Sequence, residues 1–337
     1  MKLILFALIP LILSIGITPV LSFDFLPESN AVKAKGNSLT ETNSKKVCGD
    51  RLCSELTSKK SSVSKESETA GTVVYQNGLY SLVEISEDLY SFSNFVYFSM
   101  VLVTDEGVIV VDPTGIEHSE EMLQAIKSVT YQPVKYLIYS HNHWDHSLGG
   151  QTFKDSGATV LSHVDARDWF LDNPNSDVIV PDEVWKGNQK TIVLGGKTLE
   201  LHHFGPSHGE GMTVFYLPDE KIVFVGDLVS SHTVGFGILG DFIPSEWERT
   251  LTEVEKLDFE TVMYSHKKAF GPAYEVTEQR EFIQDLRGEI SRMMEEGVYP
   301  ITIPAMIDLP KYQDWGAYDQ WIEMNAWRVL LEYWIGW

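Results

Sequence analysis

Cysteine is nearly absent from this 337-residue sequence, which contains only Cys48 and Cys53. Two thiols supply at most half of a metal site, and such a half site is weak without further ligands nearby. In an oxidising compartment a local pair of this kind forms a small disulfide, which is what we expect here. Two free thiols are the alternative, and we assign neither cysteine a catalytic role.

Basic residues are also scarce. The sequence has 26 Lys and Arg against 48 Asp and Glu, which gives a net charge of -22. A phosphate backbone would be repelled by this charge, and no basic stripe compensates for it, so nucleic acid is not an expected partner. The acidic surface favours solubility and does not identify a substrate.

The N-terminus has the pattern of a targeting segment. Lys2 precedes an apolar stretch over residues 3–21, and residues 20–22 form a plausible cleavage site. We interpret residues 1–22 as a signal peptide and expect the rest of the protein to be secreted or otherwise extracytoplasmic. The stretch is also long enough to cross a bilayer, so an uncleaved N-terminal anchor is the alternative and the only expected membrane contact.

Residues 23–70 have little apolar periodicity and are rich in Ser, Lys, Glu, Asn and Thr. Such a segment cannot bury enough surface to offset the entropy of ordering it, so we expect a flexible polar tether that contains both cysteines. Order should begin near Gly71. We divide the remainder into a main domain over residues 71–275 and a helical extension over residues 276–337.

The main domain alternates short β-like runs with helical patterns. Strands are expected at 79–85, 95–103, 107–111, 134–140, 158–161, 191–194, 198–203, 212–216, 221–225 and 260–264. Helices are expected at 117–129, 165–171 and 245–257, the last with Ser245 as N-cap and Glu248 completing a capping box. Two mixed half-sheets with helices outside suit this order, which predicts an α/β fold, a four-layer αββα sandwich.

The helical extension carries Trp321, Trp327 and Trp334 within residues 318–334. This aromatic spacing favours a helix that packs on its own domain, as core or lid. A homodimer face is the alternative.

The most informative motif is His141-Asn142-His143-Trp144-Asp145-His146, which directly follows the expected strand 134–140. Imidazole and carboxylate are the usual protein ligands of zinc and related metals. Alternate residues of an extended segment point the same way, so His141 and His143 can hold one ion, while Asp145 and His146 can turn toward a second. The competing interpretation, a solvated polar loop, does not explain so many ligand types behind an apolar strand.

More potential ligands follow other expected strands. They are Asp112, His208, Asp227 and His266. Polar groups at the same end of successive strands are how a sheet scaffold builds one site from distant parts of a sequence.

These motifs resemble those of the metallo-β-lactamase superfamily, which includes glyoxalase II-like thioesterases and acyl-homoserine lactonases. The resemblance covers roughly residues 71–270, and the His-x-His-x-Asp-His run, the Gly-x-x-His, the Gly-Asp and the last strand-end His occur in the family's order. It implies the metallo-β-lactamase sandwich, followed here by a C-terminal helical extension.

The resemblance also implies a role for each ligand. The first metal would be held by His141, His143 and His208, and the second by Asp145, His146 and His266. Asp227 would bridge the two, and Asp112 would support the metal loop from behind.

The family pattern also bears on the substrate. Asp227 stands where some true β-lactamases have cysteine, which points toward the glyoxalase II-like and lactonase-like branches. The last histidine lies in Ser265-His266-Lys267 where Gly-His-Gly is usual, and Ser230 replaces a substrate-binding lysine or tyrosine.

The ligand set predicts hydrolysis. Two divalent ions about 3.5–4 Å apart share a water and lower its pKa toward about 7, and the resulting bridging hydroxide attacks a carbonyl ester, thioester, lactone or amide of a small molecule. Zn²⁺ is the expected metal, with iron or manganese as alternatives. Asp145 is the expected catalytic residue, because it can orient the nucleophile and pass a proton to the leaving group.

The remaining histidines receive more modest roles. His118 begins a helix, where we expect it to be solvated, and we expect His163, His202 and His203 to be structural. His232, in the loop before the glycine-rich segment 234–240, is a candidate for the substrate pocket together with Ser230. Trp144 could wall that pocket or equally pack beneath the motif.

Three other functions stay open. A phosphodiesterase of the same superfamily is disfavoured by the acidic charge and the export signal. A mono-iron enzyme resembling the persulfide dioxygenases would use fewer ligands than the seven present. An inert metal-binding protein is disfavoured by the complete ligand set with its aspartate bridge.

Overall fold

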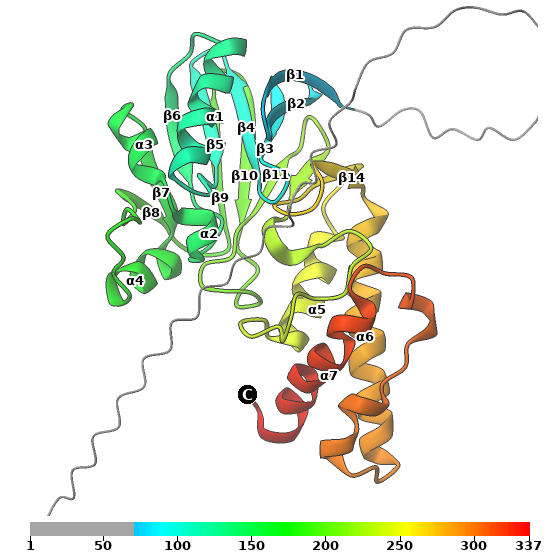
Figure 1. The fold of residues 1–337 in the computed structure, drawn as a ribbon. Coiled ribbons are helices and arrows are strands. Elements are labelled where there is room, and N and C mark those ends of the chain that lie inside the picture. Colours follow the sequence, from blue (N-terminus) through cyan, green and yellow to red (C-terminus); the bar gives the residue numbers. More distant parts are fainter. Residues whose placement is uncertain (1–70) are drawn as a thin grey trace, which may run out of the picture. The chain divides into compact units, whose positions relative to one another are not determined.

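The computed structural model describes residues 71–337 (Figure 1). The predicted signal peptide, tether and Cys48–Cys53 disulfide lie outside the described residues. None of the helices within residues 71–337 is long and apolar enough to span a membrane. All of the described residues belong to one compact unit.

The first sheet has eight strands in sequence order. They are β1 (Thr72–Asn77), β2 (Tyr80–Ser86), β3 (Leu89–Ser93), β4 (Phe98–Thr104), β5 (Gly107–Val111), β6 (Val134–Ile138), β7 (Thr159–His163) and β8 (Glu183–Trp185). The strands from β1 to β5 pair antiparallel, and those from β5 to β8 pair parallel. Every residue of β4 and β5 is buried, as expected of strands covered on both faces.

The second sheet has six strands in the order β14-β13-β12-β11-β10-β9. They are β9 (Gln189–Leu194), β10 (Lys197–His202), β11 (Val214–Leu217), β12 (Ile222–Phe224), β13 (Thr261–Met263) and β14 (Phe270–Pro272). Only β12 and β13 pair parallel, because the helix α5 (Pro244–Val254) crosses over between them.

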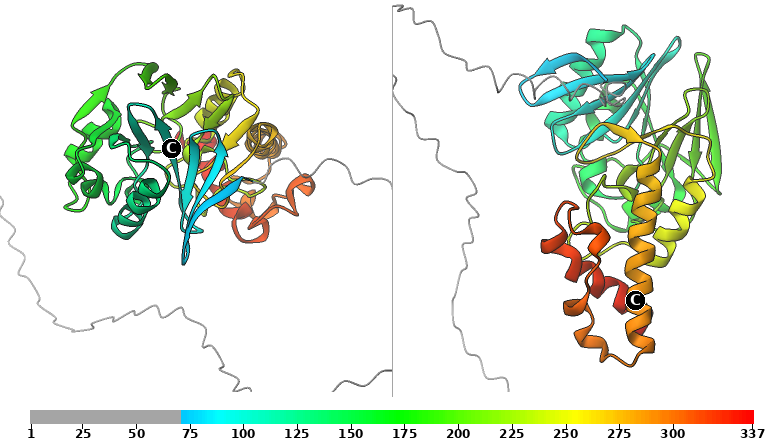
Figure 2. Two further views of the ribbon diagram at one scale, coloured as in Figure 1. Left: turned by 90° about the horizontal axis from the view of Figure 1, so that it is seen from above. Right: turned by 90° about the vertical axis from the view of Figure 1, so that its right-hand side faces the viewer.

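Helices cover the outer faces of both sheets. The remaining helices are α1 (Ile116–Val129), α2 (Trp144–Ser147), α3 (Gly150–Asp155), α4 (Val164–Asp172), α6 (Tyr274–Glu295) and α7 (Tyr318–Ile335), with short 3₁₀ turns η1 (Gly226–Leu228), η2 (Pro300–Thr302), η3 (Pro304–Met306) and η4 (Pro310–Tyr312). Figure 1 shows α1 and α3 beside the first sheet, and Figure 2 shows α6 running alongside α5.

Strand alternation sorts the apolar side chains into three cores. On β4, Met100 and Leu102 face the second sheet, whereas Val101 and Val103 face α1 and α3. A third core lies between the second sheet and the helices α5, α6 and α7. Burying each large apolar side chain contributes roughly 1.5–3 kcal/mol, so the order of layers is strongly specified. The predicted αββα sandwich with C-terminal helices is therefore confirmed.

Several local expectations differ from the structure. The strands β1, β3, β8 and β14 were not predicted, and the run 95–103 is a loop over 94–97 followed by β4. The assignment of Ser245 as N-cap is wrong, because α5 begins at Pro244, which is favoured at the first helical position. Instead the backbone N–H of Ser245 donates to the Glu332 carboxylate of α7 at 3.1 Å, and its hydroxyl donates to the same carboxylate.

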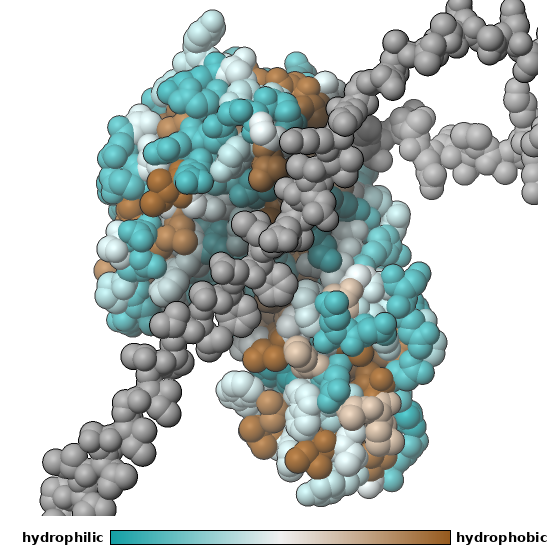
Figure 3. Space-filling model, viewed as in Figure 1, coloured by the Kyte–Doolittle hydropathy of each residue, from teal (hydrophilic) through white to brown (hydrophobic). Residues whose placement is uncertain are grey.

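The C-terminal tryptophans divide between core and surface. Trp321 and Trp327 pack against the third core, and the Trp321 ring lies 4.9 Å from that of Phe236. Trp334 is 48% exposed. Figure 3 shows apolar residues at the surface of this C-terminal part, so the homodimer face stays a prediction.

The expectation that His118 is solvated is wrong. It is 3% exposed and its ring packs edge-on against Phe92 at 4.8 Å, because the start of α1 folds onto the first sheet. Its Nε2 lies 3.4 Å from the Ser99 hydroxyl. Burial away from any carboxylate partner lowers the pKa of His118 to about 4.

This buried imidazole predicts a pH-dependent stability. Between the folded pKa of about 4 and the usual value of 6.5, the unfolded chain binds more protons than the folded chain, so the free energy of unfolding falls as pH falls. At about pH 5 the loss from His118 should be on the order of 2 kcal/mol. Urea unfolding at neutral pH and at about pH 5 should show that His118→Gln loses less stability than the wild type. Glu117→Gln, on the exposed side of the same helix, should lose as much as the wild type, and equal losses in all three would contradict the prediction.

Candidate metal centre

The two parallel strand ends of the first sheet hold the motif. Asp112 follows β5 and Ser140 follows β6, and these strands pair parallel, so both residues emerge at one edge. The fully buried Asp112 carboxylate accepts from the Ser140 backbone N–H at 2.7 Å and from the Ser140 hydroxyl at 2.6 Å. It also accepts from His146 Nδ1 at 2.9 Å. Asp112 therefore fixes the entry of the motif and the orientation of one of its imidazoles.

The same hydrogen bonds select the free nitrogen of each ring. The Ser140 hydroxyl donates to Asp112, so it must accept from His141 Nδ1, which lies 2.8 Å away. Both His141 and His146 thus use Nδ1 behind the motif and present Nε2 in front of it. This arrangement is the usual one for histidines that bind metal, whose second nitrogen is fixed by an outer hydrogen bond.

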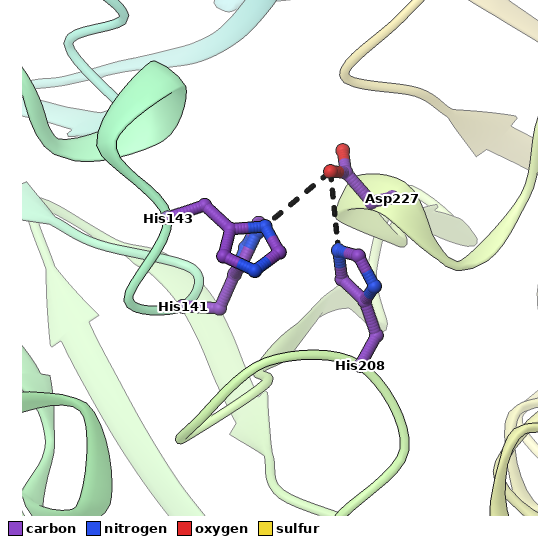
Figure 4. A group of neighbouring side chains, drawn as sticks. All are labelled: His141, His143, His208 and Asp227. Carbon is purple, nitrogen blue, oxygen red and sulfur yellow. Dashed lines mark hydrogen bonds and ion pairs between the residues drawn. The ribbon is translucent and has the colours of Figure 1, made fainter. Parts of the chain in front are cut away.

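The first ligand group combines four side chains from three segments. His141, His143, His208 and Asp227 each offer one ligand atom, and these atoms all lie within 4.8 Å of one another. Figure 4 shows the imidazoles converging from the motif and from the loop of His208 toward the carboxylate. Asp227 Oδ2 lies 3.3 Å from His208 Nε2 and 3.7 Å from His141 Nε2.

The second ligand group consists of Asp145, His146 and His266. Asp145 Oδ2 lies 3.7 Å from His146 Nε2 and 3.9 Å from His266 Nε2. The other oxygen of Asp227, Oδ1, lies 3.2 Å from each of these two imidazole nitrogens. One carboxylate therefore faces both groups, with a different oxygen toward each.

The second sheet places Asp227 and His266 side by side. They follow the parallel strands β12 and β13, and the Ser265 hydroxyl donates to Asp227 Oδ1. Gly226 has φ of 56°, a left-handed conformation that lets the chain turn directly after β12 without a side-chain clash. His266 Nδ1 donates to the Val96 carbonyl at 3.2 Å, so its Nε2 is also left for the centre.

The pKa shifts of His141, His146 and Asp227 indicate a site that would be stabilised by a bound cation. Burial lowers the pKa of His141 well below its usual value, so this imidazole is neutral and has a free lone pair. Burial also acts to lower the pKa of His146 and to raise that of Asp227. Their mutual attraction outweighs burial, so the pKa of His146 lies well above its usual value and that of Asp227 well below.

These residues fit divalent metal ions. His141 Nε2 is buried and has no hydrogen-bond partner among residues 71–337. A bound cation would give this neutral imidazole nitrogen a partner. Imidazole nitrogens and carboxylate oxygens around one buried carboxylate are the donor set of zinc and related metals. Protons would compete with a cation for His146, so binding should weaken as pH falls.

One neighbour of the site was not predicted from the sequence. Asp241, in the loop between η1 and α5, has its Oδ2 2.5 Å from His143 Nε2 and 3.4 Å from His208 Nδ1. Burial acts to raise the pKa of Asp241, but the two imidazoles outweigh it and lower that pKa. Asp241 does not follow a strand, so the search for polar residues at the ends of expected strands missed it. An acidic residue that closes a glycine-rich loop was the only available signal.

The predicted pocket residues lie in different surroundings. Trp144 is 48% exposed, so it does not pack beneath the motif and stays a candidate for the pocket wall. The Ser230 backbone N–H donates to Gln279 at 3.1 Å, and His232 Nε2 lies 3.0 Å from Glu278. These contacts anchor the start of the loop to α6.

A further group of potential ligands, His163, Asp165 and His203, lies apart from this centre. The His163 and His203 rings are stacked at 4.1 Å with 18° between their planes. Imidazole lone pairs lie in the ring plane, so those of stacked rings run side by side and do not converge on one ion. His203 Nδ1 also donates to the Met212 carbonyl at 2.9 Å. This geometry favours the structural role that we expect for both histidines.

The hydrogen bonds of Asp112 generate a prediction for the second ligand group. Asp112→Asn keeps the shape but removes the charge that accepts from His146, so the second cation should bind about 10–100-fold more weakly. Zinc titration against a chromophoric chelator would separate the two binding steps. The first step should change less than the second, and two unchanged steps in a folded Asp112→Asn protein would contradict the prediction.

Comparison with known proteins agrees with this geometry. A family model described as the metallo-beta-lactamase superfamily matches residues 94–266. The chain is 25% identical over 182 residues to 2,4-dinitroanisole O-demethylase subunit alpha of Nocardioides sp. (strain JS1661), a match that covers 53% of this chain and 55% of that protein. It is 27% identical over 133 residues to the hydroxyacylglutathione hydrolase of Pelagibacter ubique (strain HTCC1062), which covers 39% and 50%.

The matched part thus spans about half the length of each of these two relatives. Among solved structures, a metallo-beta-lactamase from Pontibacter korlensis is similar in fold, with a TM-score of 0.55 and 24% identity over 61% of this chain and 99% of that one. Since the family model covers half of the sequence, including all seven predicted ligands, the chain belongs to the metallo-β-lactamase superfamily and is an enzyme of that fold.

Proposed function

We propose that this enzyme is an exported hydrolase that uses two divalent metal ions to cleave a carbonyl ester, thioester, lactone or amide of a small molecule. The observation that carries the proposal is the position of Asp227, whose two oxygens face two separate ligand groups. A single-metal enzyme would not need a carboxylate placed in this way. Export rests on the apolar segment within residues 1–22.

Each side chain has a defined part in this reaction. His141, His143 and His208 would hold one cation, His146, His266 and Asp145 the other, and Asp227 both. When bound, the two cations would lower the pKa of a shared water and polarise the bond to be cleaved. Zn²⁺ suits these donors best, and iron or manganese are the alternatives.

Asp145 is the residue suited to proton transfer. Its side chain is 42% exposed, whereas that of Asp227 is only 13% exposed, so Asp145 can reach both a water molecule and a leaving group. The exposed carboxylate would orient the attacking water, take its proton and pass that proton to the leaving group. The products are a carboxylic acid and an alcohol, thiol or amine, and a lactone would give both groups in one hydroxy acid.

The gathered donors bear on the alternatives. A mono-iron dioxygenase needs only a facial set of ligands, and the second group of three donors would then have no use. The relatives widen the panel of bonds to be tested, because one of them is named as an O-demethylase of 2,4-dinitroanisole. An aryl methyl ether therefore belongs beside nitrocefin, homoserine lactones, aryl esters, a glutathione thioester and bis-nitrophenyl phosphate.

Removal of the shared carboxylate tests the proposal. Asp227→Ala should lower kcat/KM on the best substrate by more than about 100-fold, because substitution of a residue that only hydrogen-bonds to a metal ligand can already cost up to about 100-fold. It should also reduce the metal content from two ions per chain, as measured by plasma mass spectrometry. Asp219→Ala, the same change on the exposed turn between β11 and β12, serves as the control and should leave both unchanged.

Two results would count against a binuclear hydrolase. One is a wild-type protein that is fully active with a single iron and consumes oxygen. The other is a folded Asp227→Ala protein with normal turnover and two bound ions.

A further inference from the structure

Five imidazoles gather at the proposed metal centre, and each has an outer nitrogen that would face away from a bound cation. The outer nitrogen of His141 hydrogen-bonds to the Ser140 hydroxyl, that of His146 to the Asp112 carboxylate, and that of His266 to the Val96 carbonyl. Two rings remain, His143 and His208. Their outer nitrogens face one carboxylate oxygen, that of Asp241.

We propose that Asp241 is the positioning residue of the three-histidine cation site, and that the C-terminal helix α7 holds it in place. The contact of Asp241 Oδ2 with His143 Nε2, at 2.5 Å, places the proton of His143 on Nε2 and leaves Nδ1 for the cation. The weaker approach to His208 Nδ1, at 3.4 Å, favours a proton there and a free Nε2. Nε2 of His208 is the nitrogen that faces Asp227.

The loop of Asp241 is seated directly on a ligand. Phe242 packs on the His208 ring at 4.0 Å and on Trp247 at 4.2 Å, and the two residues Phe242 and His208 form an isolated β-bridge. The Ile243 backbone N–H donates to the Ser207 carbonyl at 3.0 Å. The C-terminal end of the loop is thus fixed beside His208.

The other end of the loop is held by the C-terminal extension. The fully buried Asn325 of α7 donates through Nδ2 to the carbonyls of Gly235 and Gly237, both at 2.9 Å. Phe236, between these glycines, packs on Trp321 of the same helix. Buried hydrogen bonds to loop carbonyls restrict a segment whose glycines would otherwise leave it many conformations. α7 therefore contributes to the metal centre through the loop, without a ligand of its own.

The inference rests on the proposed metal site but not on the reaction, so it is tested by metal binding. Asp241→Asn keeps the size of the side chain and removes its charge. We expect the first cation to bind about 10–100-fold more weakly, with the second affected less. Glu210→Gln, which removes one negative charge from an exposed side chain of the neighbouring loop, is the matched control and should bind as the wild type does.

Cobalt substitution supplies a readout that a purely structural role would not change. The visible absorption of Co²⁺ in the three-histidine site reports ligand geometry, so Asp241→Asn should alter the spectrum of the first equivalent while the apo-protein melts at the wild-type temperature. An unchanged titration and spectrum would overturn the inference, and so would equal weakening by Glu210→Gln. A wild type that binds no metal would instead sink the proposed function.

The part played by α7 is tested separately. Asn325→Ala should weaken the first cation in the same direction as Asp241→Asn but less, and Gln320→Ala on the exposed face of α7 should not. Substitution of the buried Asn325 can impair folding, so a second variant is needed. Phe236→Ala removes the contact of the loop with Trp321 at a residue that is 78% exposed. If both folded variants bind Co²⁺ and Zn²⁺ as the wild type does, the helix has no influence on the centre.

Discussion

The structure of the site depends on one electrostatic constraint, the enclosure of the largely buried Asp227 carboxylate by imidazoles. Two of them, His141 and His208, approach one oxygen, and His146 and His266 approach the other. A buried carboxylate is costly unless positive charge compensates it. Against the effect of burial, the attraction of Asp227 raises the pKa of both His146 and His266, so this carboxylate favours positive charge on the rings beside it. The arrangement of the side chains therefore favours positive charge next to Asp227, whether protons on the imidazoles or bound cations supply it.

The two sheets meet this constraint with parallel strand pairs. β5 and β6 bring Asp112 to the motif, and β12 and β13 bring Asp227 to His266. The Phe98 N–H donates to the Ser265 carbonyl at 2.9 Å, which joins the start of β4 in the first sheet to the end of β13 in the second. Ligands on strand ends have little freedom, so their positions follow from the cores between and outside the sheets rather than from the loops.

This division explains what could be predicted from the sequence. The strand-end ligands were visible because a polar residue after an apolar run is a local pattern, and the order of layers was visible because periodicity is local too. The burial of His118 and the position of Asp241 were not visible, because each depends on a partner that is distant in sequence: Phe92 for His118 and the imidazoles for Asp241. The failure of Ser245 as N-cap has a local cause, since Pro244 takes the first helical position.

The C-terminal extension lies beyond the matched family segment 94–266, yet its polar side chains contact the segment 230–245, in which Asp241 approaches His143 and His208. Glu278, Gln279, Asn325 and Glu332 contact His232, Ser230, the carbonyls of Gly235 and Gly237, and Ser245, respectively. Apolar packing alone would hold α6 against α5 and α7 against α5 and α6. Polar side chains directed at successive points between Ser230 and the start of α5 add specificity of position rather than bulk stability. We therefore regard the extension as part of the support of the metal centre.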